Sequence, residues 1–178
     1  MDEAQTFTVG ISGILARIDV LVREDSTSTG NLLFDIRTTS GGIPAASDTG
    51  ILASVLLPHG TVPTDPLTMT YTSIDISSFG LSVTEGEVLA IVLRTDAGGR
   101  YLWKDGAPVY SRGEPFFRQP NVSLNWQSWS SAGLNIDFAF QTFVDVPSAV
   151  PEPSTLTLSG LGILGLLGYG WRFRRRVR

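Results

Sequence analysis

The chain has 178 residues and a formal net charge of −4, with 13 basic and 17 acidic residues. It has no cysteine and one histidine, His59, which excludes disulfide frameworks, cysteine metal sites and most histidine-dependent catalytic triads. Five of the basic residues are arginines at the extreme C-terminus, so residues 1–150 hold 8 basic and 16 acidic residues. An acidic body of this kind excludes nucleic acid as an expected partner, because phosphate binding needs a basic face.

Period-two alternation of apolar and polar residues recurs along residues 5–146 and is typical of half-buried strands. It is clearest in residues 13–24, 31–39 and 135–146. The apolar faces of these stretches are Ile14, Ala16, Ile18, Val20 and Val22; Leu32, Phe34 and Ile36; and Ile136, Phe138, Phe140 and Val144. The opposite faces, expected to be polar, hold Arg17, Asp19 and Arg23; Asp35 and Arg37; and Asp137, Gln141 and Asp145.

Further strands are expected between clusters of turn-forming residues, at positions 5–9, 51–57, 67–76, 88–95, 100–103 and 108–111. Val88–Leu93 is apolar on both faces, which predicts a central strand. Asp105-Gly106 predicts a tight hairpin between its flanking strands. Residues 43–56 fit either a strand or a lone α-helix. The pattern as a whole predicts an all-β fold, an antiparallel β-sandwich of jelly-roll type over residues 1–146.

The C-terminus differs from the rest of the chain in composition. Residues 147–154 form a Pro/Ser linker that contains Pro151, Glu152 and Pro153, and residues 156–171 carry no charge. A helix over the uncharged run would span roughly 24 Å at ~1.5 Å per residue, slightly short of a ~30 Å hydrocarbon core unless flanking residues join it. Residues 155–178 are therefore predicted to form one transmembrane helix and a basic tail, a buried core helix being the alternative. The apolar side chains of this segment are Leu156, Leu158, Leu161, Ile163, Leu164, Leu166, Leu167 and Trp171.

A basic stop follows, formed by Arg172, Arg174, Arg175, Arg176 and Arg178. Arginines beside a membrane segment stay on the cytoplasmic side, so residues 1–150 are predicted to lie on the non-cytoplasmic side. Membrane lipid is then an expected partner. The opening residues 1–10 are acidic and show no secretory signal, so we expect the native start to lie upstream.

The order of a Pro151-Glu152-Pro153 motif, an apolar run and an arginine cluster resembles the PEP-CTERM protein-sorting domain. The resemblance implies that the chain is a substrate of an exosortase, a membrane enzyme of Gram-negative bacteria. It also implies residence in the inner membrane before processing, followed by transfer to the cell surface or extracellular matrix. The body resembles the jelly-roll modules called choice-of-anchor domains, through residues 4–10, 14–22 and 137–144, which implies a fold and a surface location.

Catalytic motifs are not evident. His59 is expected in a solvent-exposed loop, and Glu85 and Glu87 are expected to flank a turn. The sequence is compatible with a structural calcium ion but does not locate a site for it. The loop carboxylates that could contribute are Asp48, Asp65, Asp96 and Asp105. We predict neither a catalytic site nor a cofactor, and we assign no metal ligands.

The late aromatic residues are candidates for stacking on sugar rings: Tyr101, Trp103, Tyr110, Trp126 and Trp129. The alternative is that Trp103 and Trp126 fill the core, since aromatic side chains dominate buried area. The leading functional hypothesis is a sorted, non-enzymatic surface or matrix protein with a structural or adhesive body, which would meet exopolysaccharide. A lectin-like carbohydrate-binding module and a glycan-active hydrolase with carboxylates dispersed along the chain are the alternatives.

Overall fold

The computed structural model describes residues 1–146 except positions 66, 68 and 108. The chain divides into two compact units, Met1–Val146 and Pro147–Arg178, and every described strand belongs to the first. The predicted linker, membrane helix and arginine cluster lie outside the described residues. Within the part that is described, no helix is long and apolar enough to cross a bilayer.

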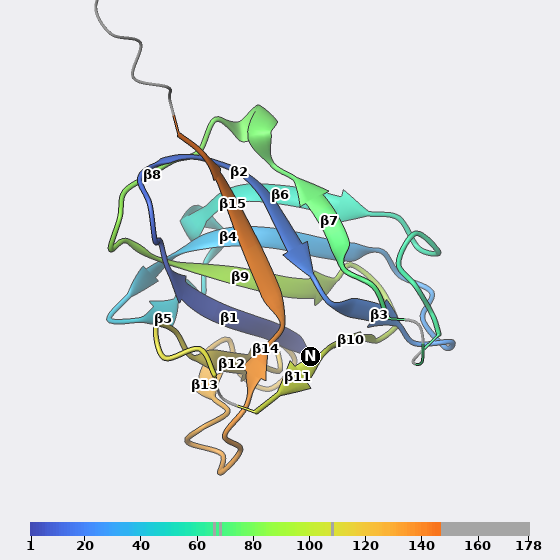
Figure 1. Ribbon diagram of the computed structural model, residues 1–178. Helices are drawn as coiled ribbons and strands as arrows, with labels where there is room; N and C mark the ends of the chain where they lie inside the picture. The colour runs from blue at the N-terminus through green and yellow to red at the C-terminus, as the bar shows by residue number, and fades with distance from the viewer. Residues whose placement is uncertain (66, 68, 108, 147–178) are drawn as a thin grey trace, which may run out of the picture. The chain divides into compact units, whose positions relative to one another are not determined.

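The larger of two main sheets has seven antiparallel strands in the order β13-β12-β1-β9-β4-β5, with β6 also paired to β4 (Figure 1). In chain order the strands are β1 Asp2–Thr8, β4 Leu32–Ser40, β5 Ile43–Pro44, β6 Ile51–Leu57, β9 Val88–Thr95, β12 Pro115–Arg118 and β13 Gln127–Ser128. β9 lies between β1 and β4, which confirms the central strand predicted from its two apolar faces.

The smaller sheet has four strands: β15 and β7 flank β2, and β8 also pairs with β2. Figure 1 shows it in front of the larger sheet. Two short ladders, β3–β10 and β11–β14, complete the described pairing. The bounds are β2 Gly13–Val20, β3 Val22–Glu24, β7 Thr72–Asp75, β8 Ser82–Val83, β10 Tyr101–Trp103, β11 Asp105–Gly106, β14 Asp137–Phe138 and β15 Phe140–Asp145.

The antiparallel all-β prediction is confirmed, whereas jelly-roll connectivity stays a prediction. Residues 43–56 form β5, a 3₁₀ turn at Asp48–Gly50 and β6, so the strand reading of this stretch is correct. The hairpin predicted at Asp105-Gly106 is wrong. These two residues pair with Asp137 and Phe138, and the preceding strand pairs with β3, because both strands find partners distant in sequence.

The main core lies between the inner faces of the two sheets. Phe7, Phe34 and Ile91 come from the larger sheet and Ile18 and Ile74 from the smaller one, all at most 2% exposed. The rings of Phe7 and Phe140 approach to 5.8 Å between centroids across this interface. Each fully buried aliphatic or aromatic side chain of this kind contributes roughly 1.5–3 kcal/mol, so this core is the main source of stability.

A β-bulge alters the predicted alternation in β2. The register with β15 passes from Phe143 opposite Arg17 to Val144 opposite Leu15, which leaves Ala16 as an extra residue. Leu15 is consequently fully buried, while Ile14 and Ala16, predicted to face the core with Ile18, are half-buried. A strict period-two pattern cannot predict a bulge. The extra residue moves every side chain beyond it to the opposite face of the strand.

The outer face of the larger sheet is also covered at one end, by a second apolar cluster made of Ala4, Ala90, Val92, Phe116 and Trp126. Asp35 and Arg37 lie on this outer face, as the alternation predicts, yet both are 0% exposed. Residues 45–48 and Trp126 pack over this part of the sheet. The polar face predicted for β4 is therefore buried rather than solvated.

Candidate functional site

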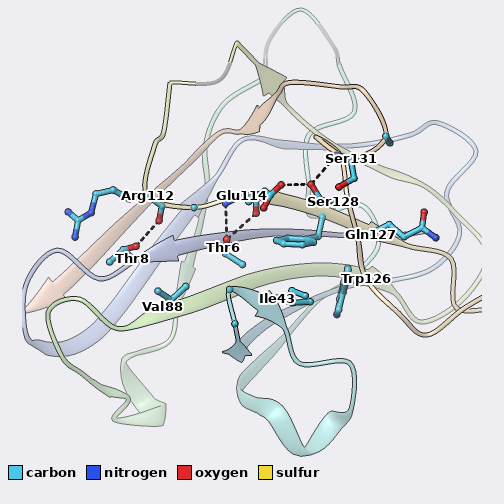
Figure 2. A pocket seen from close by; sticks show the side chains of 15 residues that line it. Thr6, Thr8, Ile43, Val88, Arg112, Glu114, Trp126, Gln127, Ser128 and Ser131 are labelled. Carbon is cyan, nitrogen blue, oxygen red and sulfur yellow. Dashed lines mark hydrogen bonds between the residues drawn. The ribbon is translucent and has the colours of Figure 1, made fainter.

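An open groove of about 840 Å³ lies on the outer face of the larger sheet (Figure 2). Its floor is formed by Thr6 and Thr8 of β1 and Val88 of β9. The β4–β5 turn, with Ile43, forms one side, and residues 112–114 with 126–132 form the other. Because β5 and β13 stand at opposite ends of the strand order, the sheet must curl to bring both to one groove.

Side chains of β1 hold the backbone of residues 112–114 against the sheet. The Thr8 hydroxyl donates to the Arg112 carbonyl at 2.7 Å. The Thr6 hydroxyl donates to the Glu114 carbonyl at 3.1 Å and accepts from the Glu114 N–H at 2.8 Å. A Cβ added to Gly113 would lie 1.9 Å from the Thr6 carbonyl oxygen, so this close approach requires glycine.

One carboxylate, that of Glu114, lines the groove. The Ser128 hydroxyl donates to Glu114 Oε1 and accepts from the backbone N–H of Ser130 and Ser131 at 3.1 and 3.4 Å. The carboxylate is thus oriented by a residue from the neighbouring strand. The exposed side chains of Arg112, Gln127 and Ser131 also line the groove, and no described residue engages their polar ends.

Arg118 and Trp126 tie the two sides of the curled sheet together. Arg118 Nη1 donates to the Ala46 carbonyl at 2.8 Å, and the Trp126 indole N–H points to the Ala45 carbonyl at 3.5 Å. The Arg118 guanidinium also lies 4.5 Å from the Trp126 ring centroid and pairs with Asp2 at 2.8 Å. These contacts join segments that are far apart in sequence.

A buried ionic cluster supports the same segment from the other side. Arg37 donates to Asp35 at 2.7 Å and to the carbonyls of Ala45 and Ser47 at 3.3 Å each. Arg94 and Ser54 donate to the same carboxylate at 2.8 and 2.7 Å. Burial alone would raise the pKa of Asp35, but these hydrogen bonds from Arg94, Ser54 and Arg37 hold it below its ordinary value.

The structure distributes the five predicted aromatic residues over several surroundings. Tyr101 and Trp103 lie in β10 and are 8% and 5% exposed, so the core alternative holds for Trp103. Trp103 stacks on Phe138 at 4.7 Å, and its indole N–H donates to the Ala139 carbonyl at 2.9 Å. A ring in this position has no free face for a sugar.

The remaining three aromatic residues lie nearer the groove. Trp126 lines it but is 8% exposed, because its ring belongs to the outer apolar cluster. The Tyr110 hydroxyl accepts from the Thr8 N–H at 3.0 Å, and the Trp129 ring packs 4.3 Å from that of Phe117. Glycan binding by the five residues stays a prediction, but they do not share one surface.

Sequence reasoning missed a buried carboxylate beside the lone histidine. Glu24 is 1% exposed and bonds to His59 Nδ1 and to the Gly60 N–H, the latter at 2.9 Å. The His59 side chain is 52% exposed, so its loop position is confirmed, but one ring nitrogen is held by the protein. No local signal could reveal this pair, since the partners are 35 residues apart.

The other carboxylates considered from the sequence lie in separate places. Glu85 and Glu87 flank a turn at Gly86 and are exposed, as predicted. Asp48 contacts Arg37, and Asp96 accepts from the Asn31 side chain at 2.7 Å. Among the described residues, no group of three or more His, Asp or Glu side chains is placed to hold a metal ion.

Comparison with known protein families gives one match, and it covers residues outside the described part of the chain. Residues 149–176 match the PEP-CTERM protein-sorting motif. The match confirms the resemblance read from the C-terminus and spans Pro151, Glu152 and Pro153, the uncharged run and the arginines up to Arg176. A motif of this kind implies export and membrane anchoring, followed by recognition by an exosortase. No curated protein and no solved structure matches the chain, so the choice-of-anchor resemblance of the body stays a prediction.

Proposed function

We propose that this chain is a surface or matrix protein of a Gram-negative bacterium whose folded body acts outside the cell as a non-catalytic structural or adhesive module. The C-terminal segment would hold it in the inner membrane until an exosortase cuts near Pro153 and passes the body outward. The match of residues 149–176 to the sorting motif carries this proposal.

The chemistry of the tail supports the order of events. Sixteen residues without a charge, 156–171, favour lipid over water, and the following arginines resist translocation. The tail would therefore halt export and expose the Pro151–Pro153 motif just outside the bilayer. The acidic body is also compatible with a position outside the cell. The positive-inside rule keeps arginine and lysine on the cytoplasmic side, but it places little constraint on carboxylates.

The groove on the larger sheet supports a binding role more than hydrolysis. Glycoside hydrolysis needs two carboxyl groups about 5–10 Å apart across a cleft. Glu114 is the one acidic residue among those that line the groove. The buried carboxylates of Asp35 and Asp2 are paired with Arg37 and Arg118 and brace the sheet.

The sorting proposal is tested in a host that encodes an exosortase, with the chain placed behind a working export signal. Mass spectrometry of the mature protein should show that the residues after about position 153 are absent. Replacing Pro151 and Pro153 by alanine should leave the tail attached, whereas the matched control Pro147→Ala, outside the matched residues, should be processed normally. Retention of the full tail by the unaltered chain, with the exosortase present, would overturn the proposal.

A further inference from the structure

We infer that the groove on the larger sheet is a binding site for a neutral polysaccharide chain. This inference rests on the proposed function, since only an exported body meets extracellular polysaccharide. It assigns the ligand to the concave face of one sheet rather than to the set of late tyrosines and tryptophans.

The size and shape of the groove suit a segment of a chain. Its volume of about 840 Å³ lies at the upper end of the 300–1,000 Å³ typical of ligand sites. Gly41 and Gly42 form part of one side, and a Cβ built at either position meets nothing within 4 Å. The rim is therefore low at the β4–β5 turn, which leaves room for an extended ligand to pass over it.

The polar groups of the groove suit sugar hydroxyls. The Glu114 carboxylate is an acceptor held in place by Ser128. Arg112 and Gln127, whose side chains extend in opposite directions in Figure 2, and Ser131 add donors and further acceptors along the groove. Planar carboxylate, amide and guanidinium groups can bond two adjacent hydroxyls at once. The opposite side offers the apolar surface of Ile43, which is 49% exposed.

The site is also built rather than incidental. The backbone that presents Arg112 and Glu114 is fixed to β1 by three hydrogen bonds with Thr6 and Thr8. Substitution at Gly113 would force this backbone away from the sheet. A groove wall fixed in this way loses little conformational entropy when a ligand binds, which favours affinity.

Charge decides which polysaccharide is favoured. Within the groove the cation of Arg112 and the anion of Glu114 offset each other, so the lining offers no net attraction to a uronic-acid chain. The surrounding residues 1–150 hold 16 acidic against 8 basic residues and would repel such a polymer. A neutral chain meets neither obstacle.

The test uses the full chain in a nonionic detergent, run in native gels containing soluble dextran, galactomannan or xyloglucan, with alginate as the acidic comparison. At least one neutral polymer should retard the protein and alginate should not. Ser131→Trp places a large ring in the groove and should weaken binding about tenfold or more, which is ~1.4 kcal/mol. The matched control Ser130→Trp changes an exposed neighbour that does not line the groove, and should bind as the unaltered chain does.

Two milder variants guard against a folding defect in Ser131→Trp. Gln127→Ala should also weaken binding severalfold, whereas Gln119→Ala, exposed and outside the groove, should not. The inference is overturned if no neutral polymer retards the chain, if alginate alone does so, or if Ser131→Trp and Gln127→Ala bind unchanged. None of these outcomes bears on C-terminal processing, so the sorting proposal stands or falls on its own test.

Discussion

The buried pair of Asp35 and Arg37 offers the sharpest test of how this fold is held together. Arg37 is 0% exposed and donates to Asp35 twice, at 2.7 and 3.2 Å, as well as to the carbonyls of Ala45 and Ser47. Arg37→Met keeps much of the volume and removes every one of these hydrogen bonds. The Asp35 carboxylate would retain Arg94 as a cationic partner, but two loop carbonyls would lose a donor.

The expected cost follows from these contacts. Breaking a buried ion pair by removing one partner costs about 3–5 kcal/mol. The remaining bond from Arg94 moves the estimate toward the lower end of this range. The carbonyls of Ala45 and Ser47 add little, because each keeps another donor, the Trp126 indole N–H and the Gly50 N–H respectively. We therefore expect Arg37→Met to lower the free energy of unfolding by about 3–5 kcal/mol. That is a large part of the 5–15 kcal/mol usual for a domain.

The measurement is urea unfolding of the full chain in nonionic detergent, followed by far-ultraviolet circular dichroism and analysed by linear extrapolation. Arg112→Met is the matched control: its side chain is exposed and engages no described residue, so its effect should stay within about 0.5 kcal/mol. The double variant Asp35→Asn, Arg37→Met should lose less free energy of unfolding than the two single variants lose together, because the two residues interact directly. A loss below about 1 kcal/mol for Arg37→Met would refute the reasoning.

Two further predictions concern Glu3 and Gly113. Burial raises the pKa of Glu3 from 4.5 to about 7, so its stabilising contribution is complete below pH 4.5 and is lost as the pH rises through 7. The free energy of unfolding should therefore fall by up to about 3 kcal/mol between pH 5 and pH 8. Urea unfolding of the Glu3→Gln variant at pH 5 and pH 8 should show a smaller difference between the two free energies. Gly113→Ala should destabilise the chain by about 1–3 kcal/mol, because its Cβ would lie 1.9 Å from the Thr6 carbonyl oxygen. Gly106→Ala, whose Cβ meets nothing within 4 Å, should unfold near the original temperature, and equal melting of the two variants would contradict this account.

Local patterns were enough to predict the all-β fold class and the sorting motif at the C-terminus. Alternation located most strands, and the two apolar faces of Val88–Leu93 identified the central one, because a strand's periodicity reports directly which of its faces are covered. The sorting motif was readable for a similar reason. Proline, an uncharged run and arginines each act through their own chemistry and need no distant partner.

Tertiary structure alone decided how deeply the polar faces are buried and where the groove lies. Alternation placed Asp35 and Arg37 correctly on the outer face, but only the packing of residues 45–48 and Trp126 makes that face an interior. Glu24 meets His59 across 35 residues by the same principle. A sequence records the preference of each face for water or for apolar surroundings. It does not record which remote segment will supply those surroundings, because that depends on the curl and register of whole sheets.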